Sequence, residues 1–393
     1  MQVVFEAPST CSGILQSALY WSGAADAMKK KKDRQKVTMH QIAAKAAVSL
    51  GTVSHVINNS AGVREPIRRR VLEAIASLGY QPSLLARGFR RNKTTIVGMI
   101  IPDILNPFFP QVVRGVEDAL YKDSYRLVLC NADNDAKKEQ VYVDELSGYR
   151  IAGLIVIASV DSQLTAMVTS SRFADMPVIC LDRRAAGWKG DSITVDNAEG
   201  AFQATQHLLQ LGHRQIATIT GPLHVNNAME RLNGYKRALR EASIPIAPEY
   251  IQEGRFDRLS GYEKTLTLLR YSPCPTAIFA ANDLIALGVL AAIQELALRC
   301  PEDVSLIGFD DLELDAFTKP SLSSVAQPGY HMGARAANLL LDRIKGLEAP
   351  PQHVVMQTLL KIRGSVAPPR IASGTSPVIA QGSRKRARVA VRR

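Results

Sequence analysis

The chain has 393 residues, which exceeds one ordinary folding core and indicates two or three folding units. Its 48 Lys and Arg against 36 Asp and Glu give a net charge of +12. Fifteen basic and three acidic residues fall in 29–93, and seven basic residues without an acid fall in 370–393, so 94–369 is acidic overall. A basic segment beside an acidic body favours a protein that binds nucleic acid over one that binds a membrane surface.

Other patterns exclude further classes of protein. No apolar run is long enough to cross a bilayer, and residues 1–28 lack the basic start and apolar stretch of a secretory signal. The five cysteines are far apart and have no paired metal spacing, so we expect buried thiols and no metal site. We therefore expect a cytoplasmic, nucleoid-associated protein without a cofactor. Met28 precedes four lysines, as at a bacterial start, and we expect 1–36 to be a disordered extension.

Residues 37–59 predict two short helices joined by a tight turn at Ala47 and Val48. Thr38 and Gln41 have the spacing of a capping box, and Ser49 is placed to cap the second helix. The predicted inner stripe consists of Ile42, Ala43, Ala46, Val53, Val56 and Ile57. The outward side chains of the second helix are small and polar, which suits close contact with the major groove. An ordinary helical hairpin is the alternative.

A third helix is expected over 67–78, where Gly79 ends it, and a short helix over 83–89 follows Pro82. The short helix would be marginal alone, so we expect it to need a partner. These boundaries give a helix-turn-helix domain over 37–81 and a hinge helix or linker over 82–93.

From Thr94 onward, apolar runs alternate with amphipathic segments, which predicts an α/β core of two doubly wound halves. Strands are expected at 96–101, 127–130, 153–157, 178–181, 193–195, 216–219, 277–280 and 304–309. Helices are expected at 110–121, 137–149, 197–211, 228–242 and 284–296. We assign about 94–195 and 328–350 to one half and about 196–327 and 351–364 to the other. A disordered basic tail is expected over 365–393.

Polar and aromatic residues follow the expected strand ends, where ligands bind in such sheets. The expected ligand contacts among them are Asn106, Phe108, Phe109, Asp182, Arg183, Asn282, Asp310 and Gln327, and Asp283 and Asp311 also follow strand ends. Carboxylates, amides and guanidinium groups can each bind two adjacent hydroxyls, while an aromatic face covers the apolar side of a sugar ring. The set predicts a polyol site, although a helix cap or a loop hydrogen bond remains the alternative for any single residue.

Six separated motifs occur in an order that resembles the LacI/GalR family of bacterial transcription regulators, over about 37–364. They are the helix-turn-helix pattern, LGYQP at 78–82, PDILNPFF at 102–109, LGHR at 211–214, AND at 281–283 and GFDD at 308–311. The resemblance implies a homodimer on a near-palindromic operator in double-stranded DNA, with a core similar to periplasmic sugar-binding proteins. It adds Arg231, which no spacing singled out, to the expected ligand contacts.

The resemblance also implies the DNA contacts. They are Thr38, Ser49, Leu50, Gly51, Thr52, Ser54, His55 and Asn58 in the head and Ser83, Leu85, Ala86 and Phe89 in the hinge. Leu50, Gly51 and His55 take the family's base-reading positions. Phe89 stands where the family usually has Leu, and it is expected to act as a minor-groove wedge or to pack against the partner hinge.

We therefore expect a repressor, not an enzyme, that a pentose or hexose controls by binding in the core. The residue types resemble sugar-binding relatives more closely than purine-responsive ones. Arg183 and Arg231 leave open a phosphorylated metabolite or a protein co-repressor as the controlling partner. An α/β enzyme is the remaining alternative, but the sequence has no phosphate loop, nucleophile elbow or metal-ligand spacing.

Overall fold

The computed structural model describes residues 37–57, 62–80, 94–168 and 176–370. The chain divides into two units, 1–92 and 93–393, which we call the head and the core. The expected extension, Asn58, the expected hinge helix and residues 371–393 lie outside the described residues. Within the described ranges, no helix has the length and apolar character needed to cross a membrane.

The head contains the three expected helices, α2 (Met39–Ala46), α3 (Leu50–Ile57) and α4 (Glu65–Leu78). Gln41 Oε1 accepts the Thr38 N–H at 2.8 Å, and Thr38 Oγ1 accepts the Gln41 N–H at 3.5 Å. Ser49 Oγ accepts the Thr52 N–H at 3.2 Å. The predicted capping box and the cap on the second helix are therefore confirmed.

Arg70 from α4 fixes the turn between α2 and α3. Its Nε and Nη2 donate to the Ala46 carbonyl at 3.2 and 2.7 Å, and Nη2 also donates to the Ala47 carbonyl at 3.1 Å. Ala47 has a φ of 51°, in the left-handed region that costs energy for a residue with a Cβ. The guanidinium satisfies carbonyls that the end of α2 leaves without intrahelical partners, and so it supports this turn.

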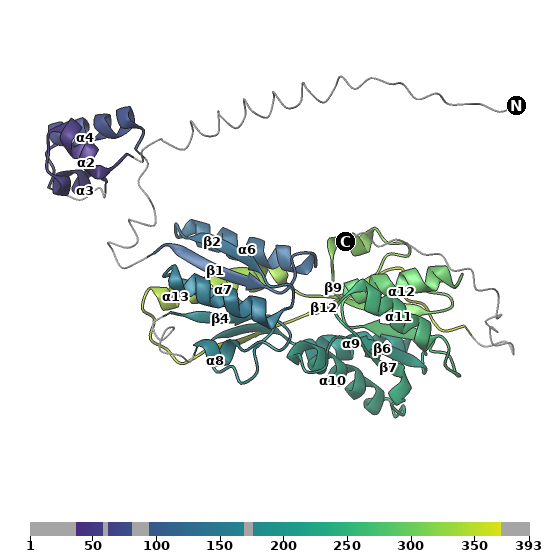
Figure 1. Cartoon of the computed structure of the whole chain (residues 1–393). Coiled ribbons are helices and arrows are strands. Elements are labelled where there is room, and N and C mark those ends of the chain that lie inside the picture. The colour runs from purple at the N-terminus through teal and green to yellow at the C-terminus, as the bar shows by residue number, and fades with distance from the viewer. Residues whose placement is uncertain (1–36, 58–61, 81–93, 169–175, 371–393) are drawn as a thin grey trace, which may run out of the picture. The chain divides into compact units, whose positions relative to one another are not determined.

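The core consists of two α/β halves, which we call the N-half and the C-half (Figure 1). The N-half sheet has the order β11-β5-β4-β3-β1-β2, and all its strands are parallel. Its strands are β1 (Ile96–Ile101), β2 (Arg126–Asn131), β3 (Gly153–Val156), β4 (Val178–Leu181), β5 (Ser192–Val195) and β11 (His353–Met356). The inner strands are buried on both faces because α6 (Phe108–Lys122) and α13 (Gly329–Ile344) cover one side and α7 (Ala136–Gly148) and α8 (Leu164–Val168) the other.

The C-half repeats this plan with the order β12-β10-β9-β8-β6-β7. Its strands are β6 (Ile216–Thr220), β7 (Ile251–Glu253), β8 (Ala277–Ala280), β9 (Ser305–Asp310), β10 (Ser323–Ala326) and the antiparallel β12 (Leu359–Lys361). Helices α9 (Asn197–Gln210) and α10 (Asn226–Glu241) cover one face, and α11 (Arg258–Leu268) and α12 (Asp283–Glu295) cover the other. Two short 3-10 helices, η2 (Pro248–Tyr250) and η3 (Glu313–Ala316), complete it. The two doubly wound halves are as predicted.

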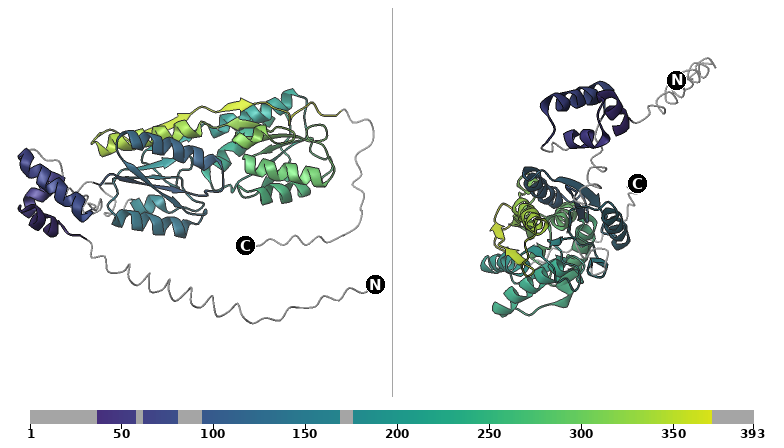
Figure 2. Two further views of the ribbon diagram at one scale, coloured as in Figure 1. Left: turned by 90° about the horizontal axis from the view of Figure 1, so that it is seen from above. Right: turned by 90° about the vertical axis from the view of Figure 1, so that its left-hand side faces the viewer.

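The predicted boundary between the halves after residue 350 was wrong. β11 pairs in parallel with β5, with Val354 opposite Ile193, so 351–356 belongs to the N-half. β12 then pairs with β10 of the C-half, and the chain therefore crosses at 357–358. Figure 2, in its left panel, shows this last segment in yellow-green to yellow passing from one half to the other.

The predicted start of a disordered tail at Ser365 was also wrong. Ser365 is fully buried; its Oγ donates to the Leu306 carbonyl at 2.6 Å and accepts the Ser323 N–H at 2.8 Å. The Ala367 N–H donates to Ser305 Oγ at 3.0 Å, and the Ala367 carbonyl lies 2.9 Å from Nε2 of the buried His213. The segment 365–367 is part of the C-half because its polar groups are bonded beside β9.

The sequence patterns did not predict β7 or α11. β7 has only three residues, and α11 contains Gly261, which lowers helix propensity. A Cβ on Gly261 would lie 2.1 Å from the Ile285 carbonyl oxygen, so the glycine is needed for the close packing of α11 on α12.

Arg343 on α13 offers a test of the loop that leads from α13 into β11. It donates to both carboxylate oxygens of Asp191 at 2.8 and 2.9 Å and to the carbonyls of Leu347, Ala349 and Pro350. We expect Arg343→Met to lower the free energy of unfolding by about 2–3 kcal/mol, because it leaves a buried carboxylate with fewer donors. Urea unfolding followed by the fluorescence of Trp188, whose Nε1 donates to the Asp191 carbonyl, measures this.

The matched control is Arg335→Met on the same helix, where the guanidinium makes one exposed 3.4 Å bond to Gln352. It should change stability by less than about 0.5 kcal/mol. Equal effects of the two substitutions would show that Arg343 does not secure the loop before β11.

Candidate functional site

The head presents one polar face on α3. Leu50 is 40% exposed, and Gly51 and His55 are also exposed, whereas Val53 and Val56 are buried against α2 and α4. Thr52 and Ser54 are half-buried beside this face. The structure thus places the predicted base-facing positions on one exposed surface. Leu50 and Gly51 lie in the first turn of α3, where backbone N–H groups favour phosphate, and His55 lies in its last turn. Thr38 and Ser49, which cap α2 and α3, are exposed. The remaining predicted contacts, Asn58, Ser83, Leu85, Ala86 and Phe89, lie outside the described residues.

The nine predicted ligand residues of the core are all buried, with exposed fractions from 2% to 7%. Seven of them follow or end strands β1, β4, β8, β9 and β10 or begin the next helix. Arg231 comes from α10 instead, and Phe109 is the second residue of α6. The set is Asn106, Phe108, Phe109, Asp182, Arg183, Arg231, Asn282, Asp310 and Gln327.

Arg231 is the centre of the C-half part of this set. Its Nε donates to Asn197 Oδ1 at 2.8 Å, and its Nη1 donates to the Ala281 carbonyl at 2.5 Å. Nη1 also lies 3.8 Å from Asp310 Oδ1, and the guanidinium carbon lies 3.6 Å from the centre of the Phe309 ring. Gln327 Nε2 donates to the same Asp310 oxygen at 2.7 Å. The resemblance therefore identified a residue that joins α9, β8 and β9.

Arg183 is the corresponding centre in the N-half. Its Nη1 donates to Asn134 Oδ1 at 2.9 Å, and its Nε lies 3.9 Å from Asp182 Oδ2. The guanidinium carbon lies 5.8 Å from the centre of the Phe109 ring and 4.9 Å from that of Phe256. Because Phe256 follows β7, Arg183 contacts an aromatic ring from each half.

Two of the predicted ligand residues also have a structural role. Asn282 caps α12, since its Oδ1 accepts the Ile285 N–H at 2.9 Å, and its Nδ2 donates to the Phe256 carbonyl at 3.5 Å. Asn106 Oδ1 accepts the Phe108 N–H at 3.0 Å. For these two residues, the alternative of a cap or a loop hydrogen bond is therefore present in the structure.

The four charged groups balance one another. Arg183 and Arg231 face Asp182 and Asp310, and all four are at least 95% buried. Burial raises the pKa of both carboxyls, that of Asp310 to about 7. Burial also lowers the pKa of both guanidinium groups. The opposite charges limit each shift.

Three further residues belong to this cluster but were not predicted: Asn134, Asn197 and Phe256. Asn134 lies three residues after β2 with a φ of 55°, so its place after a strand end was the available signal. Phe256 was not found because β7 itself was not. Among the described residues, no three His, Cys, Asp or Glu side chains are grouped to hold a metal ion.

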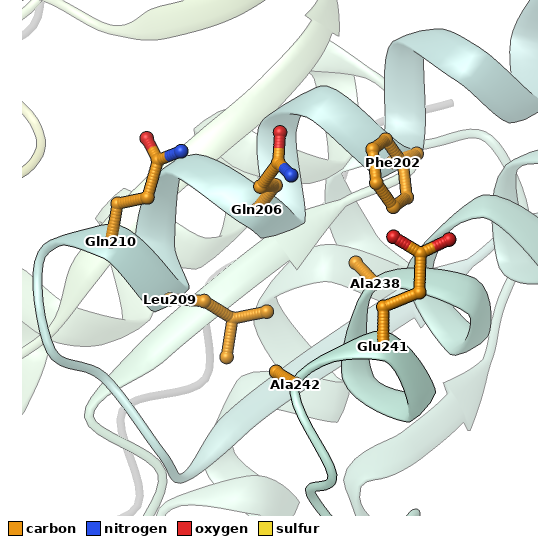
Figure 3. Close-up of a pocket in the computed structure, with 7 residues that line it drawn as sticks. All are labelled: Phe202, Gln206, Leu209, Gln210, Ala238, Glu241 and Ala242. Atoms are coloured by element: carbon orange, nitrogen blue, oxygen red, sulfur yellow. The ribbon is translucent and has the colours of Figure 1, made fainter.

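A surface depression of about 330 Å³ lies elsewhere, between α9 and α10 (Figure 3). Its lining residues are Phe202, Gln206, Leu209, Gln210, Ala238, Glu241 and Ala242. None of the nine predicted ligand residues lines it, so it is separate from the buried polar cluster.

The raised pKa of Asp310 has a consequence for stability. Between about pH 4 and 7 the folded protein holds a proton on Asp310 that the unfolded chain has released, so stability falls as the pH rises through this range. Asp310→Asn should reduce the slope of the free energy of unfolding by up to about 1.4 kcal/mol per pH unit. Urea unfolding at several pH values measures this, with Glu313→Gln as the control. Parallel slopes for Asp310→Asn and the unchanged protein would contradict it.

Comparison with known proteins agrees with both parts of the chain. Residues 38–83 match the model of bacterial regulatory proteins of the lacI family, and residues 205–366 match that of the periplasmic binding protein-like domain. The HTH-type transcriptional repressor PurR of Aliivibrio salmonicida is 38% identical over 309 residues, covering 78% of this chain and 92% of that protein. The PurR of Aliivibrio fischeri is 37% identical over 332 residues, covering 84% and 98%.

Solved structures show the same fold. The Lac repressor dimer bound to operator and the anti-inducer ONPF has a TM-score of 0.75 at 28% identity, covering 85% of this chain and 100% of that one. The regulator CelR in complex with cellobiose has a TM-score of 0.65 at 33% identity, covering 84% and 99%. A LacI family regulator from Enterococcus faecium with bound ribose has a TM-score of 0.63 at 33% identity, covering 70% and 99%. These relatives are regulators rather than enzymes, which rejects the enzyme alternative, and the chain belongs to the LacI family as a DNA-binding transcriptional repressor.

Proposed function

We propose that this repressor binds a near-palindromic operator as a homodimer and that a neutral sugar, a pentose or a hexose, controls it from the buried polar cluster of the core. A repressor acts where the DNA is, so we place it in the cytoplasm, at the nucleoid. The observation that carries the choice of ligand is the balanced charge of Arg183, Arg231, Asp182 and Asp310.

The charge balance favours a neutral ligand over a phosphorylated one. Two guanidinium groups already pair with two carboxyl groups away from water, and their charges balance once Asp310, whose pKa is raised to about 7, has lost its proton. A phosphate would bring about two further negative charges into this site, where an uncompensated charge costs several kcal/mol. The arrangement thus argues against the sugar phosphate that the two arginines left open.

The available hydrogen-bonding atoms suit hydroxyl groups. Among the described residues, Asp182 Oδ1, Arg183 Nε and Gln327 Oε1 are buried without a hydrogen-bond partner. The two oxygens are acceptors and the nitrogen is a donor. A sugar hydroxyl can donate to either oxygen and can accept from the nitrogen. The Phe108 and Phe109 rings, whose centres are 5.4 Å apart, supply an apolar surface for the carbon face of a sugar.

The named ligands of two structural neighbours, cellobiose and ribose, fit this class. A purine base is the second candidate, because the sequence relatives carry the name PurR. A flat base would stack between aromatic rings, but Arg183 already lies beside both Phe109 and Phe256. This occupancy favours the sugar.

A ligand panel tests the proposal. The full-length protein is heated with ribose, xylose, glucose, galactose or cellobiose, with ribose 5-phosphate or glucose 6-phosphate, and with adenine, guanine or hypoxanthine. One of the free sugars should raise the unfolding midpoint by about 5 °C at a hundredfold excess over its Kd. A response to a purine or a phosphate alone would contradict the choice of ligand.

Gln327→Ala should weaken binding of that sugar at least tenfold, since its buried amide is one of the free partners. Gln206→Ala makes the same change in the depression between α9 and α10 and should leave the affinity unchanged.

We propose that the edge strand β2 forms part of the dimer interface. It pairs with β1 on one side only, and Val128 and Leu129 are 40% and 39% exposed on it. Tyr121 at the end of α6, 64% exposed, lies 5.2 Å from the Arg126 guanidinium carbon at the start of β2. An open, apolar sheet edge of this kind is normally covered in a stable protein, and a second copy would cover it.

We expect Leu129→Asp to convert the dimer to a monomer, because it places a charge in the proposed interface. Sedimentation measures the mass, and operator affinity should fall at least a hundredfold as the second head is lost. Met229→Asp on α10 alters a residue of equal exposure, 38%, and should change neither property. A Leu129→Asp protein that remains dimeric would exclude β2 from the interface.

The DNA contacts follow from the exposed face of α3 and from the family resemblance. Leu50, Gly51 and His55 read bases in the major groove, while Thr38, Thr52, Ser54 and Asn58 face phosphates. Ser49 and the hinge residues Ser83, Leu85 and Ala86 are further DNA contacts, and Phe89 enters the minor groove as the wedge.

A further inference from the structure

Two buried carboxyl groups of the C-half lie outside the set of predicted ligand residues. Asp283 is the first residue of α12, and Asp315 lies in η3; both are fully buried. A buried carboxyl group is costly unless donors or an opposite charge compensate it. Their surroundings therefore show what these residues do.

Asp283 joins the start of α12 to strand β10 and to the loop before η3. Its two oxygens accept the Ser324 hydroxyl at 2.7 and 2.9 Å, and one of them accepts the Leu312 N–H at 3.2 Å. Each bond lies close to a predicted ligand contact in the chain, because Asn282 precedes Asp283, Asp310 is two residues before Leu312 and Gln327 is three residues after Ser324. The Asp283 carboxyl is thus in a position to set the relative placement of those three side chains.

Neither carboxylate oxygen of Asp315 has a well-formed hydrogen bond in the described part of the chain. The Asp283 side chain and the Leu312 N–H are both within reach of it, but the Leu312 N–H already donates to Asp283. Two ionised carboxylates are acceptors only and repel each other. A single proton between them gives Asp315 its missing donor and removes the repulsion.

The other charged groups near the pair do not replace this proton. Asp310 and Asp311 at the end of β9 add negative charge. Arg363 is the positive group that faces Asp315, but its Nη2 donates to Asp311 Oδ1 at 2.5 Å and its Nη1 to the Leu322 carbonyl at 2.6 Å. Consistently, burial raises the pKa of Asp283 well above its usual range and that of Asp315 to about 6.

We propose that Asp283 and Asp315 share one proton and that this carboxyl pair is a positioning device, which holds η3 and the loops with Asn282, Asp310 and Gln327 in place for the effector. The part that concerns the effector rests on the proposed function; the shared proton does not. Because the folded state retains a proton that the unfolded chain releases near pH 4, the pair's contribution to stability is greatest in acid and declines as the pH rises.

The test uses the ligand-free, full-length protein and the variants Asp315→Asn, Asp315→Ala and Glu313→Gln. The asparagine can donate its Nδ2–H to an ionised Asp283, so the shared proton becomes unnecessary. Infrared difference spectra at pH 8 should show a protonated-carboxyl stretching band in the unchanged protein and in Glu313→Gln that is lost in Asp315→Asn. A band of equal intensity in Asp315→Asn would overturn the proposal.

Hydrogen exchange tests the positioning role separately. Asp315→Ala should speed exchange of the amides in 311–316 at least tenfold, because η3 loses its bond to Asp283, whereas Asp315→Asn should stay within threefold of the unchanged protein. Protection that is equally lost in both variants, or retained in both, would overturn the role. If no sugar in the panel raised the unfolding midpoint, the proposed effector would be rejected. The results on the shared proton and on hydrogen exchange would not be affected.

Discussion

The core depends on compensating charge that is buried between its two halves. Arg231 and Arg183 are each placed by hydrogen bonds to their own half, through Asn197 and the Ala281 carbonyl in one case and Asn134 in the other. Their carboxylate partners are also buried. Removing either an arginine or its carboxylate would therefore leave the remaining charge buried without compensation. This constraint explains why polar residues follow so many strand ends, and it is the basis for proposing a neutral ligand.

The same constraint relates ligand binding to the arrangement of the halves. Arg183 contacts Phe109 of the N-half and Phe256 of the C-half, and the chain itself crosses between the halves at 357–358. A sugar bound to both arginines would therefore stabilise one relative placement of the halves. It can alter DNA affinity only through a difference in its affinity for two such placements. The Asp283–Asp315 pair adds a local support beneath the C-half loops.

The sequence predicted elements whose signal is local and missed those set by distant contacts. The capping box at Thr38 and Gln41 and the apolar strands were readable, because caps and buried strands leave short-range patterns. β7 is too short to show alternation. The pairing of β11 with β5 depends on residues 161 positions apart, so the predicted boundary between the halves after 350 was wrong. Ser365 shows the same limit, since its partners Leu306 and Ser323 come from other strands. In the ligand set, strand ends indicated eight residues, whereas Arg231 came only from the family resemblance. Asn134, Asn197 and Phe256 were found only in the structure.

The most direct test of a ligand-controlled repressor is a linkage measurement on one sample. Operator affinity is titrated with and without the sugar identified by thermal stability, and sugar affinity is titrated with and without operator, at one fixed salt concentration. The account predicts that the sugar weakens operator binding at least tenfold and that operator weakens sugar binding by the same factor. A sugar that binds the core tightly while operator affinity stays unchanged would contradict it.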